Sequence, residues 1–405
     1  MLSVEVSGAK NISLALLPTA LFADRIIFKN LPNIVDVNIQ REILRTLGIN
    51  EIVEKNTIIY IKKSIDTFMV PERLGSKIRA SFYFLGALLS CTGRAEIPHP
   101  GGCNAEERKI DIHVGALRYM GARVIVNNKT IYAENRNMLA KHIRLPMPSK
   151  GATINLIFAS LRLCGQTVIE NASIVPEIRT LVNLLQGIGN DIFIDGSNII
   201  IRGRHHKISS ITYTVQYDRI EMATFVILGL LLGEEICING INLETIKDFL
   251  GFLDSINVVY SIRGEKIIIY RKQKLKPAQV YLGFPPAIDS DYGPIITPLL
   301  CLINGRSIVE DRHNTHRINN LLAELAFLGA KYRMLAENVF EIQGIREFCG
   351  NRTLVGQDIR GSMGMVLAAL VSKGRVKVKG LSHIDRAYEN FLGKLELMGI
   401  NVDVF

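Results

Sequence analysis

The segment IPHPGGCNAEERKIDIH, residues 97–113, places a cysteine among residues that do not form a core. Cys103 follows a Pro-Gly-Gly triplet and precedes two glutamates and Arg108. A cysteine that only fills space is expected inside an apolar run, as a small buried hydrophobic residue. In a charged, turn-rich segment a thiol can instead donate a proton or act as a nucleophile, because its pKa responds to nearby charges. The pattern therefore predicts a reactive cysteine on a loop.

Charged residues recur where six apolar helical patterns begin. The six starts are SGAKN with Lys10 and Asn11, SKIRAS with Lys77 and Arg79, PSKGAT with Ser149 and Lys150, YDRIEMAT with Asp218, Arg219 and Glu221, AIDSDYG with Asp289 and Asp291, and GQDIRGS with Asp358 and Arg360. A cation at this end of a helix opposes the helix dipole, so its recurrence predicts an anionic ligand held by helix ends and side chains together. More exposed helical patterns add Arg108, Arg317 and Arg386. For any one of these cations the alternative is a solvated surface residue.

The elements that position these residues repeat at intervals of about 70 residues. Helical patterns end in glycine or asparagine at positions 48, 121, 189, 257, 329 and 399. A left-handed helix C-cap is expected at such positions. Within each repeat this helix follows a more apolar helix, a turn and a short strand, as in LLSCTGRAEIP and LLLGEEICING. The repeat is therefore predicted as a βαβαββ-type unit that occurs six times.

The two helices of each repeat differ in their apolar pattern. The first, as in GATINLIFASLRLCG, is apolar nearly all round and is expected to be buried. The second, as in IDIHVGALRYMG, has one apolar stripe of Ile110, Val114 and Leu117 and is expected to be more exposed. A chain of 405 residues usually forms more than one domain. The six repeats thus predict two α/β domains of three repeats each, with sheets around buried helices and a cleft between the domains.

The composition is that of a globular protein, with 48% hydrophobic and 21% charged residues. The net charge of +10 favours anionic partners, but aromatic residues are not interleaved with a basic patch, so nucleic acid is not expected. No apolar run is long enough for membrane insertion, and no secretion signal is expected at the N-terminus. Six cysteines without CxxC pairing predict reduced thiols in a cytoplasmic protein, and metal-ligand spacing is absent.

Segments in order along the whole chain resemble the enolpyruvyl transferases, in particular the branch that acts on UDP-N-acetylglucosamine. They are SGAKN, RAS...LGALL, PGGC....R.IDIH, DRIE.ATF, QDIRGSM and HIDRAYEN. The related shikimate-pathway branch lacks the Pro-Gly-Gly-Cys loop. The resemblance implies a two-domain inside-out α/β barrel with three repeats per domain. It implies residues 10–217 as an inserted domain, residues 1–9 with 218–405 as the second, and an active site between them.

The resemblance also implies a reaction and a set of site residues. The enolpyruvyl group of phosphoenolpyruvate would move to the 3-hydroxyl of UDP-N-acetylglucosamine with release of phosphate, the first committed step of peptidoglycan synthesis. Cys103 would be the proton donor, Asp291 the base, and Lys10, Arg108 and Arg386 the residues that hold phosphoenolpyruvate, without a metal or organic cofactor. The implied substrate-binding residues are Lys10, Asn11, Arg79, Arg108, Lys109, Ile110, Asp111, Ile112, Ser149, Lys150, Asp291, Arg317, Asp358, Arg360 and Arg386.

Several loops depart from the family pattern. Glutamates at 106–107 replace small residues, Lys109 stands in place of a proline, and Val35 stands where the family has a lysine. The segments 148–151 and 290–293 also differ from the usual uridine-side and base-bearing loops. Two alternatives therefore stay open: a paralogous enolpyruvyl transferase with a different nucleotide-linked acceptor, and a catalytically silent relative that binds anions.

Overall fold

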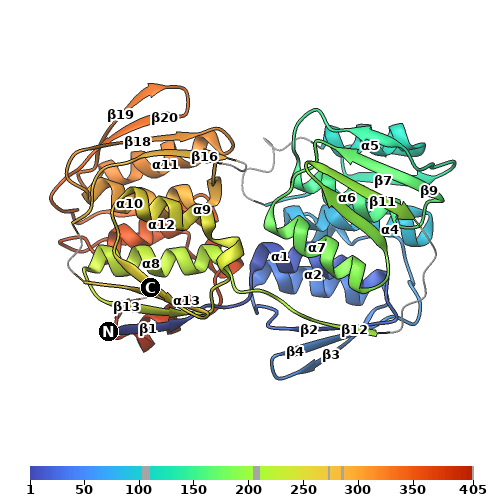
Figure 1. The fold of residues 1–405 in the computed structure, drawn as a ribbon, viewed down its shortest axis with the longest axis horizontal. Helices are drawn as coiled ribbons and strands as arrows, with labels where there is room; N and C mark the ends of the chain where they lie inside the picture. Colours follow the sequence, from blue (N-terminus) through green and yellow to red (C-terminus); the bar gives the residue numbers. More distant parts are fainter. Residues whose placement is uncertain (103–109, 204–209, 272–273, 284–286, 404–405) are drawn as a thin grey trace. The chain divides into compact units, whose positions relative to one another are not determined.

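The computed structural model describes residues 1–102, 110–203, 210–271, 274–283 and 287–403. The chain forms two compact units, which we call the inserted unit, residues 8–216, and the discontinuous unit, residues 1–7 with 217–405 (Figure 1). These ranges lie within two residues of the domain ranges expected from the resemblance. Each unit has its own sheets and its own buried helices, so each is described separately.

The inserted unit contains three sheets among its described residues, in the strand orders β12-β2-β4-β3, β5-β7-β6 and β10-β11-β9-β8. Its strands are β2 Arg25–Lys29, β3 Asn50–Glu54, β4 Thr57–Ile61, β5 Arg94–Pro98, β6 Ala122–Val126, β7 Thr130–Asn135, β8 His142–Arg144, β9 Gly165–Glu170, β10 Asp191–Asp195, β11 Asn198–Gly203 and β12 Ser210–Thr214. Its helices are α1 Lys10–Leu16, η1 Leu17–Leu21, α2 Val35–Thr46, α3 Glu72–Gly75, η2 Arg79–Tyr83, α4 Phe84–Thr92, α5 Asp111–Met120, α6 Lys150–Ser160 and α7 Pro176–Gly187.

The discontinuous unit also contains three sheets among its described residues, in the orders β1-β13-β15-β14, β17-β16-β18-β20-β19 and β21-β22. Its strands are β1 Leu2–Glu5, β13 Ile236–Asn239, β14 Tyr260–Arg263, β15 Lys266–Ile269, β16 Gln279–Gly283, β17 Ile288–Asp289, β18 Arg306–Asp311, β19 Lys331–Ala336, β20 Val339–Gln343, β21 Thr353–Val355 and β22 Lys377–Lys379. Its helices are α8 Arg219–Leu232, η4 Leu243–Thr245, α9 Lys247–Ser255, η5 Ser290–Tyr292, α10 Gly293–Leu302, α11 Thr315–Ala326, α12 Ile359–Leu370, η6 Leu381–Arg386 and α13 Phe391–Leu397.

The repeat is confirmed at the level of backbone conformation. All six predicted cap positions have positive φ, from +65° to +103°, and five of them are glycines. The sixth, Asn257, has φ +65°, which asparagine tolerates better than most residues with a Cβ atom. These caps end the second helix of each repeat and direct the chain into the strands that follow.

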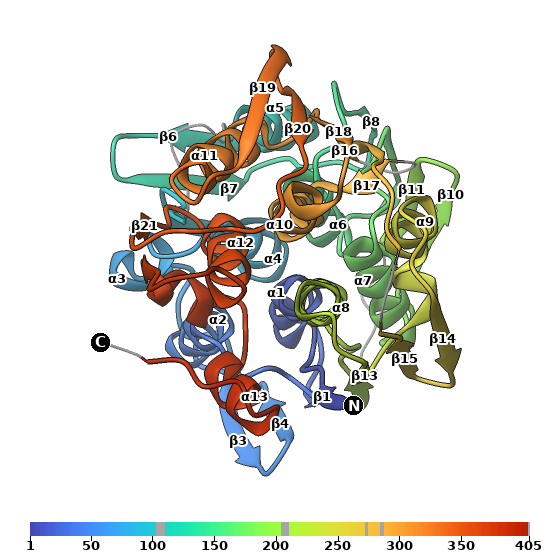
Figure 2. The same cartoon turned by 90° about the vertical axis from the view of Figure 1, so that its left-hand side faces the viewer.

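The first helices of the repeats are buried, as their apolar pattern predicts. Residues 152–160 of α6 and 360–368 of α12 are all buried. Figure 2 shows α8, α10 and α12 in the interior of the discontinuous unit, with its strands outside them. Two close approaches need glycine: a Cβ on Gly86 would lie 2.1 Å from the Asn155 carbonyl oxygen, and one on Gly364 would lie 2.4 Å from that of Pro294. Helix α4 therefore packs closely on α6, and α12 packs closely on α10.

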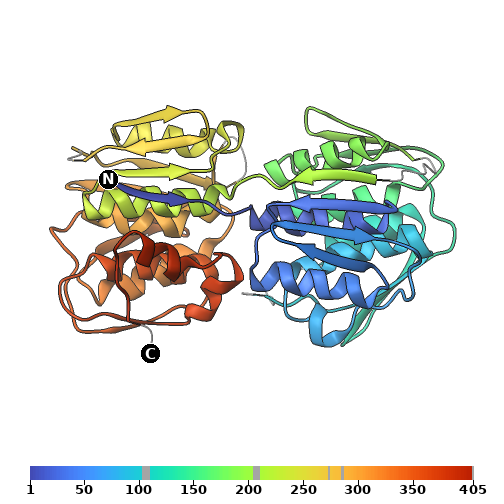
Figure 3. The same ribbon diagram turned by 90° about the horizontal axis from the view of Figure 1, so that it is seen from below.

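In each unit, a strand near one end of the chain segment pairs with a strand that is distant in the sequence. Strand β1 pairs in parallel with β13 in the discontinuous unit, and β12 pairs in parallel with β2 in the inserted unit (Figure 3). The chain passes between the units twice. At these passages Asp218 N donates to Ser7 O (2.8 Å) within the discontinuous unit, and Ala9 N donates to Gln216 O (2.7 Å) within the inserted unit.

Candidate active site

A carboxylate held by two arginines marks the candidate site in the discontinuous unit. Arg317 Nη1 lies 2.7 Å from Asp291 Oδ1, and Arg360 Nη2 lies 3.2 Å from Asp291 Oδ2. The three side chains come from η5, α11 and α12, so the packing of these helices brings them together. Each oxygen of the carboxylate has its own guanidinium, which fixes the plane of the carboxylate as well as its position.

Asp358 connects this cluster to the start of α12. Its Oδ1 accepts hydrogen bonds from the backbone N–H groups of Arg360 (3.0 Å) and Gly361 (3.1 Å), which is N-capping geometry. The same oxygen lies 3.7 Å from Arg317 Nε. Asp358 therefore caps α12 and helps to orient Arg317.

Arg360 is supported from its other side by Tyr388. Arg360 Nη1 donates to Tyr388 Oη (3.4 Å), and Tyr388 Oη also bonds Thr224 Oγ1 of α8 (3.0 Å). Burial raises the pKa of Tyr388 to about 12, even though Arg360 opposes the shift, so the phenol stays neutral. The Tyr388–Thr224 contact ties the guanidinium of Arg360 to helix α8 and to the segment between η6 and α13.

The charges of the cluster are strongly coupled. Burial alone lowers the pKa of Arg317 and Arg360, but the nearby acidic groups, Asp291 foremost among them, together outweigh this effect and the pKa of each is raised. Both arginines are therefore permanent cations. A pair of cations around one carboxylate can bind an additional anion, such as a phosphate or a substrate carboxylate, through guanidinium N–H groups.

In the inserted unit the predicted residues lie at the starts of neighbouring helices. Lys10 is the first residue of α1, and its Nζ lies 2.8 Å from Asp36 Oδ2 of α2, with both side chains buried. Ser149 caps α6 by accepting from Ala152 N (3.4 Å), and Lys150 Nζ lies 3.8 Å from Glu177 Oε1. Helices α1 and α6 both contact η2, which begins with Arg79. Each start thus carries the residue expected from the sequence.

His113 is a buried histidine of α5 that the sequence did not single out. Its Nδ1 accepts from Asn155 Nδ2 (2.9 Å), and Asn155 Oδ1 accepts from Gly86 N (2.8 Å). Burial, helped by the charge of Arg79, lowers the pKa of His113 to about 3. The ring is neutral, and the proton lies on Nε2, next to Gly151 at the start of α6.

The remaining predicted residues are divided between described and undescribed parts of the chain. Cys103, Arg108 and Lys109 lie outside the described residues. The structure describes five further predicted residues, and all five are half-buried or exposed. They are Asn11 on α1, Ile110 as N-cap of α5, Asp111 and Ile112 in its first turn, and Arg386 at the end of η6.

The helix starts have a further feature that the sequence did not reveal. Cations at four of them or beside them pair with carboxylates of the protein: Lys10 with Asp36, Lys150 with Glu177, Arg219 with Asp289, and Arg360 with Asp291. The recurring cations therefore have internal partners in addition to the anionic ligand that we expect. Tyr388 was also missed, although it stands two residues after Arg386 in a segment that carries the resemblance.

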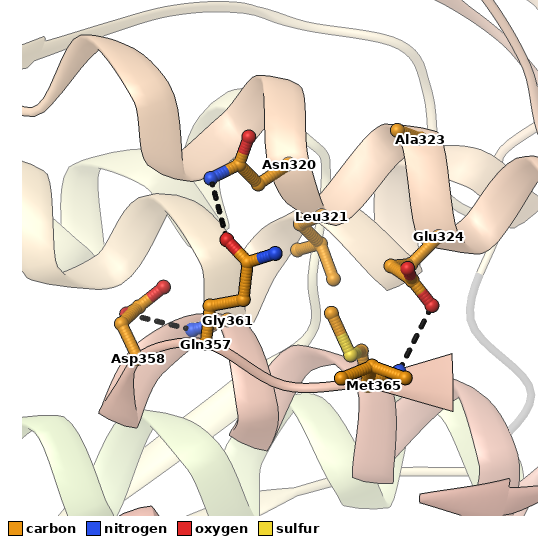
Figure 4. A pocket seen from close by; sticks show the side chains of 9 residues that line it. Asn320, Leu321, Ala323, Glu324, Gln357, Asp358, Gly361 and Met365 are labelled. Atoms are coloured by element: carbon orange, nitrogen blue, oxygen red, sulfur yellow. Dashed lines mark hydrogen bonds between the residues drawn. The ribbon is translucent and has the colours of Figure 1, made fainter. Parts of the chain in front are cut away.

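A pocket of about 120 Å³ lies next to Asp358 (Figure 4). It is lined by Asn320, Leu321, Ala323, Glu324, Val355, Gln357, Asp358, Gly361 and Met365. Its polar groups bond to one another, since Asn320 Nδ2 donates to Gln357 Oε1 (3.4 Å) and Glu324 Oε2 accepts from Val355 N (2.9 Å). The lining includes two carboxylates and no Lys or Arg, so this pocket is unsuited to an anion.

The described residues lack two kinds of feature. No group of three or more His, Cys, Asp or Glu side chains is arranged to hold a metal ion in the described part of the chain. Within the same residues, no helix has both the length and the apolar character needed to cross a membrane.

Sequence comparisons define the class of this protein. The family model of EPSP synthase (3-phosphoshikimate 1-carboxyvinyltransferase) matches residues 2–395. The chain belongs to this family, the enolpyruvyl transferases. It is 34% identical over 404 residues to the UDP-N-acetylglucosamine 1-carboxyvinyltransferase of Prochlorococcus marinus (strain AS9601), which covers 98% of this chain and 88% of the relative. It is 32% identical over 407 residues to UDP-N-acetylglucosamine 1-carboxyvinyltransferase 1 of Clostridium acetobutylicum, covering 99% of this chain and 96% of the relative.

Solved structures show the same fold. The enolpyruvyl transferase NikO from Streptomyces tendae superposes with a TM-score of 0.89 at 21% identity, over 98% of this chain and 95% of that one. EPSP synthase from Acinetobacter baumannii superposes with a TM-score of 0.77 at 17% identity, over 100% and 97% of the two chains. The expected inside-out α/β fold of the enolpyruvyl transferases is confirmed.

Proposed function

We propose that this chain is a UDP-N-acetylglucosamine 1-carboxyvinyltransferase. It transfers the enolpyruvyl group of phosphoenolpyruvate to the 3-hydroxyl of UDP-N-acetylglucosamine and releases phosphate. The observation that carries the proposal is the Asp291 carboxylate between Arg317 and Arg360. This arrangement combines an acceptor for a hydroxyl proton with two cations for a phosphate or carboxylate. The curated relatives at 31–34% identity over nearly the whole chain bear the same enzyme name.

The proposed reaction is an addition followed by an elimination. In the addition, the sugar hydroxyl bonds to C2 of phosphoenolpyruvate, its proton passes to Asp291, and the methylene carbon takes a proton from Cys103. The product is a tetrahedral phospholactoyl ketal. In the elimination, a proton passes from the methyl group back to the Cys103 thiolate, the carbon–carbon double bond re-forms, the carbon–oxygen bond to phosphate breaks, and the departing phosphate takes the proton held by Asp291. The permanent cations Arg317 and Arg360 stabilise the negative charge that shifts onto the phosphate.

Residues of both units contribute to substrate binding in this proposal. Lys10, Arg108 and Arg386 hold the phosphate and carboxylate of phosphoenolpyruvate, because each offers a cation that can pair with an oxyanion. The sugar nucleotide is bound by Asn11, Arg79, residues 108–112, Ser149 and Lys150. The Ser149 hydroxyl and the first backbone N–H groups of α6 suit an anion, since they lie at a helix N-terminus.

The proposed product belongs to peptidoglycan synthesis, and hence to cell-wall formation, cell shape and cell division. A cytoplasmic location follows from the same proposal. It is supported by the five described cysteines, Cys91, Cys164, Cys237, Cys301 and Cys349, which are all free thiols.

The test measures phosphate release from phosphoenolpyruvate in the presence of UDP-N-acetylglucosamine. Release that requires both substrates is expected. Cys103→Ala should lower the rate by about 100-fold or more, the usual contribution of a proton donor. Cys164→Ala is the matched control, because this cysteine is exposed and outside the proposed site. Equal rates for the natural protein and Cys103→Ala would contradict the proposed role of the thiol.

The same experiment distinguishes a second candidate, transfer to a different nucleotide-linked acceptor. The altered loops at 148–151 and 290–293 favour this candidate. If no phosphate is released but phosphoenolpyruvate still adds to Cys103, as detected by protein mass, then the acceptor is a different molecule. If neither happens, the chain is a silent anion-binding relative.

A further inference from the structure

The turn that carries Asp291 is held by the carboxylate two residues before it. Asp289 Oδ1 accepts a hydrogen bond from Asp291 N (2.9 Å), so Asp289 is the N-cap of η5. Asp289 Oδ2 pairs with Arg219 Nη2, whose side chain is 6% exposed at the start of α8. The backbone N–H of Asp289 donates to Asp248 Oδ2 (3.1 Å) in the first turn of α9. One residue thus connects the Asp291 turn to two helices.

A separate set of contacts holds the opposite side of the turn. Ser290 Oγ donates to Asp311 Oδ2 (2.7 Å) and accepts from Asn314 Nδ2 (2.9 Å). Tyr292 is fully buried and stacks on Phe249 with 5.0 Å between ring centroids. The residues before and after Asp291 are therefore fixed, and Asp291 itself points to Arg317 and Arg360.

We infer that Asp289 is a positioning residue, which aligns the Asp291 carboxylate by capping its backbone N–H while anchored to Arg219 and Asp248. The inference rests on the proposed function, because alignment matters only if Asp291 takes part in the reaction. Its physical basis is that catalytic groups lose efficiency when they are displaced by as little as an ångström. Without the cap, the turn can rotate and the Asp291 carboxylate can leave the position between its two arginines.

The two contacts of the Asp289 carboxylate can be separated by mutation. Asp289→Ala removes both the cap to Asp291 and the ion pair with Arg219. Asp289→Asn also removes the ion pair but keeps an amide oxygen that can cap Asp291, since Asn is as good an N-cap as Asp. The difference between these two variants therefore isolates the cap. Glu244→Gln is a control for loss of a carboxylate elsewhere in the same unit, because Glu244 is exposed and pairs only with exposed Lys247 among described partners.

The first readout is steady-state kinetics of phosphate release. We expect kcat of Asp289→Ala to fall ~10- to 100-fold below that of Asp289→Asn, with KM for both substrates unchanged. Glu244→Gln should match the natural protein. A purely structural role would lower the folded fraction of Asp289→Ala but leave kcat per folded molecule equal to that of Asp289→Asn, and this result would overturn the inference.

The second readout does not depend on turnover or on the identity of the acceptor. Hydrogen exchange of the Asp291 amide, followed in a peptide covering residues 288–293, should be about tenfold faster in Asp289→Ala than in Asp289→Asn. Equal exchange would show that Asp289 does not hold the turn and would also overturn the inference. If the natural protein releases no phosphate with UDP-N-acetylglucosamine, the proposed acceptor is wrong, while the exchange experiment still decides whether Asp289 holds the turn.

Discussion

His113 illustrates, at the scale of a single residue, how burial decides protonation. An ordinary histidine is partly charged near pH 6.5, but burial of its ring where α5 packs on α6 and on Phe82 of η2 lowers the pKa of this one to about 3. The hydrogen bond from Asn155 then requires an unprotonated Nδ1. The neutral ring consequently lies beside the start of α6 at neutral pH.

His113 should make the protein less stable in mild acid. The folded-state pKa of His113 is depressed below the unfolded value of about 6.5. The contribution of the neutral ring to the free energy of unfolding is therefore fully present above pH 6.5 and is lost as the pH falls toward 3. Between pH 6.5 and 5 the loss is about 2 kcal/mol in the free energy of unfolding. Denaturant unfolding at several pH values should show a shallower decline for His113→Gln than for the natural protein. Parallel declines would contradict this assignment.

Tyr292 and Tyr388 are both fully buried tyrosines, but they differ in their hydrogen bonds. Tyr292 Oη has no hydrogen-bond partner among the described residues, whereas Tyr388 Oη contacts Arg360 and Thr224. Tyr292→Phe should therefore leave stability unchanged or raise it by up to ~1 kcal/mol, because it removes a desolvated hydroxyl. Tyr388→Phe should destabilise by about 1 kcal/mol or more. The measurement is the free energy of unfolding of the two variants in urea. A larger loss of stability in Tyr292→Phe than in Tyr388→Phe would contradict the prediction.

At the scale of elements, the repeat is readable from the sequence because its signals are local. A glycine or asparagine with positive φ ends the second helix of each repeat, and continuous apolar patterns mark the buried first helices. Both signals come from short-range sterics and from the side-chain period of a helix. The close approach of α4 to α6 is not local, since Gly86 and Asn155 are 69 residues apart. No pattern within either helix reveals that approach.

Two glycine substitutions should separate helix packing from helix propensity. Gly86→Ala would place a Cβ 2.1 Å from the Asn155 carbonyl oxygen, so the helices must shift, at a cost of about 1–3 kcal/mol. Gly115 is an exposed position of helix α5, where a Cβ would meet nothing within 4 Å, so Gly115→Ala should stabilise by up to ~1 kcal/mol. Thermal unfolding of the two variants should move in opposite directions. Stabilisation by Gly86→Ala would disprove the close contact.

At the scale of the whole molecule, the two units differ in chain continuity. The inserted unit is one continuous segment, residues 8–216, with both ends paired in a single sheet through β2 and β12. The discontinuous unit needs β1, which pairs with β13; Val4 of this strand and Val6 just after it are buried in the core of the unit. Without β1, the edge of β13 and the apolar surface beneath it would be exposed.

This difference predicts how separated segments behave. Residues 8–216 expressed alone should unfold cooperatively. Residues 217–405 alone should be unstable or aggregate, and joining Ser7 to Tyr217 through a short glycine linker after residues 1–7 should restore cooperative unfolding. The linker can be short because Ser7 O accepts a hydrogen bond from Asp218 N at 2.8 Å. Circular dichroism during denaturation is the measurement, and equal stability of 217–405 with and without residues 1–7 would refute the role of β1.

The sequence by itself determined the repeat, its helix caps, and the charged residues at the helix starts. It did so because capping, periodicity and helix-terminal charge act within a few residues of the chain. Tertiary structure alone decided that Asp291, Arg317 and Arg360 meet in one cluster, that Asp289 pairs with Arg219, and that His113 is buried and neutral. These contacts join residues tens of positions apart, and only the packing of the helices sets their distances and their desolvation.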